Sequence, residues 1–230
     1  MRIAPYGDAD AVVTLLTERE GVVPALARRA RSASPKRSMI LEPFHTLTVE
    51  IAAGGGELSA LRSSVLDVAR VTLLADARRM EVAGLATRWT RTLSPPRAPE
   101  PEVFAALELL LDRLAAGEPD TPALAVFGLT LLEALGYALE LGSCARCNRS
   151  RPTGRSAYVA SAQGGVVCEA CRALVHVDDE PFAGAMLDAV AGDHDALMAA
   201  APVDAARVLA VVRVAIDFRA RSVGARRGGA

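Results

Sequence analysis

Residues 144–171 read CARCNRSRPTGRSAYVASAQGGVVCEAC, and they contain all four cysteines of the chain. Cys144 and Cys147 form one Cys-x2-Cys pair, and Cys168 and Cys171 form a second pair after 20 intervening residues. Two residues between thiolates allow one tight turn to aim both sulfurs at the same ion, and two such turns supply a tetrahedral set. This spacing is typical of a structural zinc site, so we predict one bound Zn²⁺ with these four cysteines as its ligands.

Other uses of the four cysteines need a different context. Two disulfides need an oxidising compartment, whereas Asp8 and Asp10 interrupt the N-terminal segment where a secretory signal would need apolar residues. A redox site normally places a single Cys-x2-Cys at the start of a helix. Disulfide or redox use is therefore the less favoured alternative, and we expect a cytoplasmic protein. Four thiolates leave no open metal position for water, so we expect the site to support structure, with His176 on the surface rather than on the ion.

The segments around the cysteines indicate a ribbon inserted between helices. Tyr158-Val159 is expected to begin a short strand, Gly164-Gly165 to turn the chain, and Val166-Val167 to lead back to the second pair, which gives a zinc ribbon over about 142–175. Apolar residues recur at helical spacing on both sides of it. Helical segments are predicted over about 68–94, 101–116, 122–141, 182–191 and 202–220.

The first 67 residues differ from the rest and are predicted to form strands. Residues 45–51 place Leu47, Val49 and Ile51 on one face, which is the pattern of a half-buried strand. Further strands are predicted over 11–17, 22–27 and 57–66, with a turn at 54–56. Several short strands in so few residues favour a small β-barrel. We therefore predict an α+β, multi-domain fold, with a β-barrel over 1–67 followed by a helical domain over 68–230.

Basic residues are concentrated in two segments although the net charge is only −1. The first segment, 28–37, follows a predicted strand and carries no acid; its basic residues are Arg28, Arg29, Arg31, Lys36 and Arg37. Such a loop is a candidate phosphate-binding surface, and the alternative is a solvated charged loop. The second segment lies in the ribbon, and its basic residues are Arg146, Arg149, Arg151 and Arg155. They are candidate secondary contacts to DNA, and the alternative is that they only increase solubility.

Signatures of enzymes and of membrane spans are missing from the sequence. It contains no P-loop, no GxSxG and no GxGxxG, and its three histidines are scattered. The longest apolar stretch, 123–132, is well short of the ~20 residues that cross a bilayer. We therefore expect a protein that is not an enzyme and does not associate with membranes.

Several elements, in this order and spacing, resemble the bacterial DNA repair protein RecO family. They are YGDADAVVTLLT at 6–17, Glu20-Gly21, ARRAR at 27–31, LEPF at 41–44, and Leu135-Gly136-Tyr137 shortly before the first Cys-x2-Cys. The resemblance extends from the N-terminus to about Cys171. It implies an N-terminal OB-fold, a helical domain and a four-cysteine zinc ribbon. The chain begins almost at the Tyr-Gly-Asp element, so we expect most of the first barrel strand to be absent, with either an upstream start or a barrel that is incomplete at one edge.

The same resemblance implies a DNA recombination mediator in the bacterial cytoplasm, associated with the nucleoid. Such proteins bind single- and double-stranded DNA, anneal complementary strands and, with RecR, help load RecA onto DNA coated by single-strand binding protein. Family members also bind the acidic tail of single-strand binding protein on the helical domain, which makes that protein a further candidate partner. In this chain, residues 100–142 hold eight acids and one Arg, so they would repel that tail unless a local basic pocket exists. The alternative function is a protein–protein adaptor, in which the ribbon and the acidic helices bind partners and DNA affinity is low.

Overall fold

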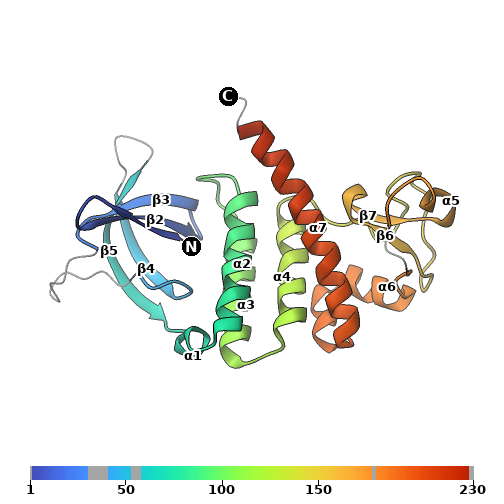
Figure 1. Cartoon of the computed structure of the whole chain (residues 1–230), viewed down its shortest axis with the longest axis horizontal. Coiled ribbons are helices and arrows are strands. Elements are labelled where there is room, and N and C mark those ends of the chain that lie inside the picture. The colour runs from blue at the N-terminus through green and yellow to red at the C-terminus, as the bar shows by residue number, and fades with distance from the viewer. Residues whose placement is uncertain (1, 31–40, 53–57, 178–179, 228–230) are drawn as a thin grey trace. The chain divides into compact units, whose positions relative to one another are not determined.

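The computed structural model of the chain describes residues 2–30, 41–52, 58–177 and 180–227 (Figure 1). By packing, the chain divides into two units, Met1–Ala116 and Gly117–Ala230. The predicted domain boundary after residue 67 coincides with the end of the last strand of the first unit, and three helices follow within the same unit. The α+β class, with strands first and helices afterwards, is confirmed.

The first unit begins with one five-stranded sheet. Its strands are β1 (Arg2–Tyr6), β2 (Asp10–Thr17), β3 (Gly21–Ala27), β4 (Thr46–Ala52) and β5 (Ser59–Val68), in the order β1-β2-β3-β5-β4. All neighbours are antiparallel except β3 and β5. Over the described residues the sheet is open, with β1 and β4 at its two edges, so a closed barrel is not observed. The predicted turn at 54–56 lies outside the described residues.

The first strand corrects one expectation from the sequence. Residues 2–6 form β1 and pair with β2 along the full length of the strand, from Arg2 opposite Thr14 to Tyr6 opposite Asp10. Pro5 is tolerated because β1 is an edge strand, where a missing backbone N–H can face away from the sheet. This segment is largely exposed, so it lacks the apolar runs and the alternation by which the other strands were predicted.

Alternating small and branched residues build the core of this sheet. Val13, Ala25, Ala27 and Leu61 are buried, and Val49 and Ile51 of β4 pack against them. Because side chains alternate between faces of a strand, Thr48 and Glu50 are exposed between these packed positions, as the two-residue periodicity predicted.

Three helices complete the first unit: α1 (Val71–Leu74), α2 (Ala77–Leu93) and α3 (Pro101–Ala116). The helical segment predicted over 68–94 is divided at Asp76, whose carboxylate accepts hydrogen bonds from the backbone N–H groups of Arg78 and Arg79. Side-chain oxygens at this position satisfy N–H groups that have no partner within the helix, and so they fix where a helix begins. The helix predicted over 101–116 is confirmed at both ends.

Two contacts attach these helical segments to the sheet. The guanidinium of Arg70, which is 2% exposed, donates to Asp112 of α3 (2.7 Å), to the Phe44 carbonyl (3.1 Å) and to Thr46 of β4 (2.9 Å). At Gly21, φ is +64° and a Cβ atom would overlap the carbonyl of Ala98, so only glycine fits this close approach.

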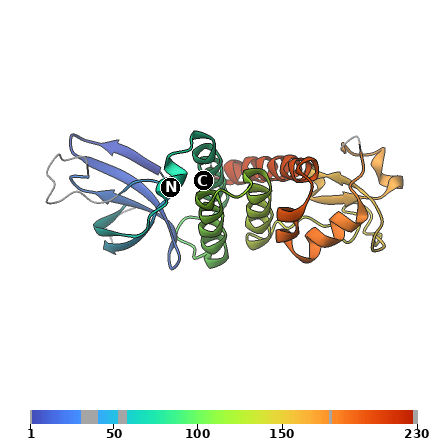
Figure 2. The ribbon, with the colours of Figure 1, turned by 90° about the horizontal axis from the view of Figure 1, so that it is seen from below.

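The second unit contains α4 (Asp120–Ala134), α6 (Gly184–Gly192), η2 (His194–Ala199) and α7 (Pro202–Arg227). Helices α4 and α7 pack side by side (Figures 1 and 2). The apolar stripe predicted on the last helix is buried, and the helix continues past residue 220. The helix predicted over 122–141 ends at Ala134, because Gly136 adopts φ +75° and the Tyr137 N–H bonds back to the Leu132 carbonyl.

Among the described residues, no helix combines the length and the apolar character that a bilayer crossing requires.

Candidate metal centre

The first pair of cysteines lies on a tight turn that follows α4. The Asn148 N–H donates to the Cys144 carbonyl (2.8 Å), and Asn148 has φ +59°, which reverses the chain just after Cys147. Upstream, the Glu140 carboxylate accepts from the backbone N–H groups of Gly142 and Ser143, each at 2.9 Å. The turn is therefore fixed from both sides by local hydrogen bonds.

The second pair lies at the end of a short hairpin. Strands β6 (Tyr158–Ala160) and β7 (Gly165–Val167) are joined by η1 (Ser161–Gln163), and α5 (Glu169–Arg172) follows (Figure 1). The predicted ribbon hairpin is thus confirmed, with a longer turn than Gly164-Gly165 alone. The Cys171 N–H donates to the Cys168 carbonyl (2.9 Å), which closes the second Cys-x2-Cys turn.

The hairpin brings the two turns together. The Ala145 N–H donates to the Val166 carbonyl, and the Val166 N–H donates to the Glu140 carbonyl, each at 2.8 Å. At Gly165, a Cβ atom would overlap the Glu140 carbonyl, so glycine allows this close packing. The first turn consequently lies against β7, beside the second turn.

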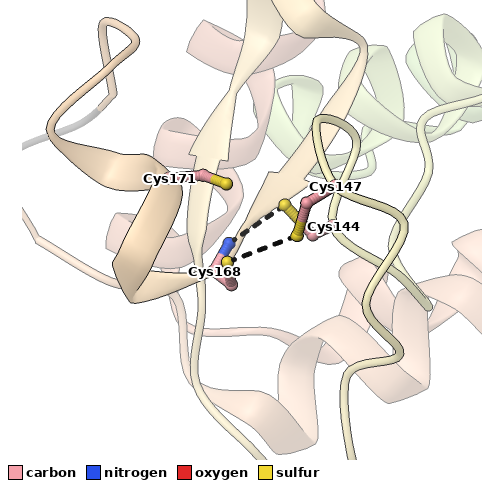
Figure 3. Close-up of side chains that lie close together, drawn as sticks. All are labelled: Cys144, Cys147, Cys168 and Cys171. Atoms are coloured by element: carbon pink, nitrogen blue, oxygen red, sulfur yellow. Dashed lines mark hydrogen bonds between the residues drawn. The ribbon is translucent and has the colours of Figure 1, made fainter.

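All four sulfurs point toward one another across the two turns (Figure 3). They lie within 4.8 Å of one another, and the Cys147 and Cys168 Sγ atoms are 3.7 Å apart. A tetrahedral site with metal–sulfur bonds of about 2.3 Å places its sulfurs about 3.8 Å apart. None of the four cysteines forms a disulfide. The spacing and the donor set fit one metal ion bound by four thiolates, as predicted.

The protein environment shifts the pKa values of Cys144 and Cys171 in opposite directions. Burial alone raises the pKa of Cys144, but hydrogen bonds from the backbone of Cys168, Cys147 and Arg146 outweigh it and lower the pKa to about 6. Burial and hydrogen bonds to the other three cysteines raise the pKa of Cys171 to about 12. The negative charge on Cys144 contributes to the raised pKa of Cys171, and a bound divalent ion would oppose this effect by favouring thiolates.

The surroundings of the four sulfurs combine an exposed histidine with a small buried core. His176 is exposed and does not belong to the four-sulfur cluster, as predicted. Cys144 and Cys171 are 3% and 8% exposed, and they pack with Ala160 and Val167 in a small apolar core. A metal bound there would add stability that so small an apolar core does not supply by itself.

Of the predicted DNA-binding residues in the first unit, two are described. Arg28 and Arg29 follow β3 and are exposed, and the Arg29 backbone N–H donates to Asp10 at 2.7 Å. Arg31, Lys36 and Arg37 lie outside the described residues.

Three of the four predicted ribbon arginines are exposed, namely Arg146, Arg149 and Arg155. The fourth, Arg151, has a side chain that is only 7% exposed, and it bonds to the Leu141 carbonyl, the Arg155 carbonyl and Asp188. These bonds hold the guanidinium within the second unit, so we no longer expect Arg151 to contact DNA.

Asp188 of α6 is the partner that the sequence analysis missed. Its carboxylate accepts from Arg151 and from the Gly154 N–H, both at 2.5 Å, and so connects α6 to the ribbon. A single aspartate within a small, apolar helix carries no sequence motif. Its role depends on a contact with a residue 37 positions away.

Asp188→Asn is expected to weaken the ribbon in a pH-dependent way. The Gly154 N–H and the Arg151 guanidinium lower the pKa of Asp188. A carboxylate with a lowered pKa stabilises the folded state above its unfolded pKa of about 4, and the contribution is lost as the pH falls through the folded pKa. Thermal unfolding from about pH 7 downward should show wild type more stable, with the two proteins converging in acid below about pH 4. Curves separated equally at every pH would contradict this role.

Comparison with protein families matches both parts of the chain. Residues 1–68 match the family model described as "Recombination protein O N terminal", and residues 74–191 match "Recombination protein O C terminal". The first match covers the open sheet, and the second extends from the end of α1 to α6 and includes all four cysteines.

Individual relatives agree with these family models. DNA repair protein RecO of Anaeromyxobacter sp. (strain K) is 37% identical over 74% of this chain and 67% of its own length. RecO of Geobacter sulfurreducens is 34% identical over 72% of this chain and 68% of its own. RecO of Pelobacter propionicus is 32% identical over 72% and 67%. With both family models matched in the expected order, the chain belongs to the RecO family of DNA repair proteins.

Proposed function

We propose that this RecO-family protein is a recombination mediator that acts by binding DNA, without hydrolysing a nucleotide. In this proposal it binds single- and double-stranded DNA without sequence preference, anneals complementary strands and, together with RecR, assists the loading of RecA. It acts in the bacterial cytoplasm, at the nucleoid. Membership of a DNA repair family supports the general role, and the individual activities are what the following experiments test.

The exposed pair Arg28–Arg29 is the observation that carries the DNA-binding part of the proposal. Both guanidinium groups are accessible, and they begin a segment of five basic residues without an acid. The bond between the Arg29 N–H and Asp10 fixes the backbone of this turn against β2, so the two charges are presented from a defined position. Guanidinium groups suit phosphate oxygens, and contacts of this kind position DNA without reading its sequence.

Neutralising the basic segment is expected to reduce both DNA affinity and its salt dependence. The variant replaces Arg28, Arg29, Arg31, Lys36 and Arg37 by glutamine. If all five contact phosphates, the slope of log K against log salt should fall by up to about 4.5 for duplex DNA and about 3.5 for single strands. Titrations at several salt concentrations measure both quantities.

A matched variant separates charge from other effects of the substitutions. Replacing the four arginines of the segment by lysine keeps every positive charge, and it should retain most of the salt slope. Arg19→Gln, on the exposed turn between β2 and β3, removes one charge elsewhere in the same unit and should have little effect. An unchanged affinity and slope in the five-fold glutamine variant would show that this segment does not bind DNA.

We also propose that the metal is one structural Zn²⁺ per chain. Four thiolates in a closed tetrahedral set favour zinc and leave no position for a reacting water. Elemental analysis of the gently purified protein should therefore find about one zinc per chain. A content far below this value, or a different metal, would contradict the assignment.

A further inference from the structure

The four cysteine residues differ in their exposure to solvent. Cys144 and Cys171 are buried in the apolar core of the ribbon, whereas Cys147 is exposed and Cys168 is half-buried. The two accessible residues are also neighbours, because their sulfurs are 3.7 Å apart. The cluster therefore has a buried edge, formed by Cys144 and Cys171, and a more accessible edge, formed by Cys147 and Cys168.

We propose that the Cys147–Cys168 edge is an oxidative modification site: a hydroperoxide such as hydrogen peroxide joins these two cysteines in a disulfide and releases the metal. This inference rests on the proposed metal binding. The modification would give this DNA repair protein a redox-sensitive ribbon, whose state follows the peroxide concentration around it.

The reaction balances as a two-electron oxidation. The Cys147 thiolate attacks one oxygen of the peroxide, the O–O bond breaks, and hydroxide leaves to be protonated to water. The resulting sulfenic acid is then attacked by the Cys168 thiolate, which forms the S–S bond and expels a second hydroxide, again protonated to water. In total, two thiolates lose two electrons, peroxide gains them, two protons are consumed, and two waters form. The ion loses two of its four ligands and dissociates.

The geometry favours this pair over the others. Cys147 is the one exposed residue of the four, and its Sγ lies 3.7 Å from the Sγ of half-buried Cys168, so the second thiolate is close enough to resolve a sulfenic acid formed on the first. Cys144 accepts a hydrogen bond from the Cys168 N–H (3.4 Å) and is 3% exposed, so peroxide reaches it poorly.

The loss of the metal would act locally. In the oxidised ribbon the Cys147–Cys168 disulfide, in place of the ion, would join the first turn to the N-terminus of α5, which supports the bond between Ala145 and Val166 and the pairing of β6 with β7. Arg151 and Asp188 still attach the ribbon to α6. Oxidation should therefore change the ribbon only near the two cysteine turns, while α4 and α7 stay packed.

The test uses the full-length, zinc-loaded protein. Its metal content is measured first, then hydrogen peroxide is added in steps, and released zinc is followed with a colorimetric chelator. Mass spectrometry of digests identifies which cysteines are bridged at each step. We expect release of one zinc per disulfide formed, with Cys147–Cys168 as the dominant first bridge, and recovery of zinc binding after reduction with dithiothreitol.

Two variants and the order of events make the outcome decisive. Cys147→His keeps a ligand but removes the exposed sulfur, and it should lose the rapid phase of zinc release; Cys144→His leaves the accessible edge intact and should keep that phase. Zinc that stays bound while peroxide is consumed, or first bridges within Cys144–Cys147 or Cys168–Cys171, would overturn this inference alone. Protein that holds no zinc before peroxide is added would overturn the proposed metal as well.

Discussion

Cys144→Ser is expected to abolish metal binding and to unfold the ribbon over about 142–175. Serine supplies no thiolate, and the remaining three sulfurs no longer enclose the ion. Because the ribbon has only a small apolar core around Cys144, Ala160 and Val167, metal binding supplies much of its folding free energy, on the order of 10 kcal/mol for structural zinc. Elemental analysis should find no zinc, and limited proteolysis should cut within the ribbon.

The first unit provides an internal control for this variant. Residues 2–30, 41–52 and 58–116 form their own sheet and helices, so fragments that contain them should resist the protease as they do in wild type. His176→Ala, five residues after Cys171, changes an exposed residue outside the sulfur cluster and should keep its zinc. A Cys144→Ser protein with full zinc content and an intact ribbon would contradict a four-cysteine site.

Arg70→Ala is expected to destabilise the first unit by about 3 kcal/mol, because the hydrogen bonds of a buried charged group, which contribute about 1.5–3 kcal/mol, are lost. The guanidinium is almost fully buried and connects α3, β4 and the segment before β4 through Asp112, Thr46 and the Phe44 carbonyl. Asp112 is 56% exposed, so water can solvate it after the change, and this keeps the cost moderate. Thermal unfolding should shift down by roughly 10 °C.

Arg79→Ala is the matched control for this substitution. Arg79 also pairs with an aspartate, Asp76, at 3.4 Å, but its side chain is 28% exposed and the pair lies at a helix start. Surface pairs of this kind contribute roughly 0–1 kcal/mol. Equal effects of the two substitutions would show that burial of Arg70 is not what connects helices and sheet.

The ribbon was predictable because its signal is local. The 28 residues from 144 to 171 contain two Cys-x2-Cys pairs, a glycine turn and two short apolar runs. Their spacing was enough to predict the four ligands and the hairpin. The strands β2 to β5 were likewise predictable, since residues 45–51 alternate and the other segments are short apolar runs bounded by turns.

Three features of the structure left no clear pattern in the sequence. Arg151 looked like the other ribbon arginines, and only its pairing with Asp188 on α6 distinguishes it. The edge strand β1 has no buried face, so periodicity does not mark it. The end of α4 depends on the left-handed conformation of Gly136 within an otherwise helical pattern.

Direct measurement of DNA binding by the full-length protein, at a salt concentration near the physiological 0.15 M and at several values on either side, tests the central proposal most directly. We expect binding to both single- and double-stranded DNA, with little dependence on sequence, and an affinity that falls linearly on a logarithmic scale as salt rises. An affinity that is absent near physiological salt, or that does not change with salt, would contradict phosphate-based DNA binding and favour the adaptor alternative.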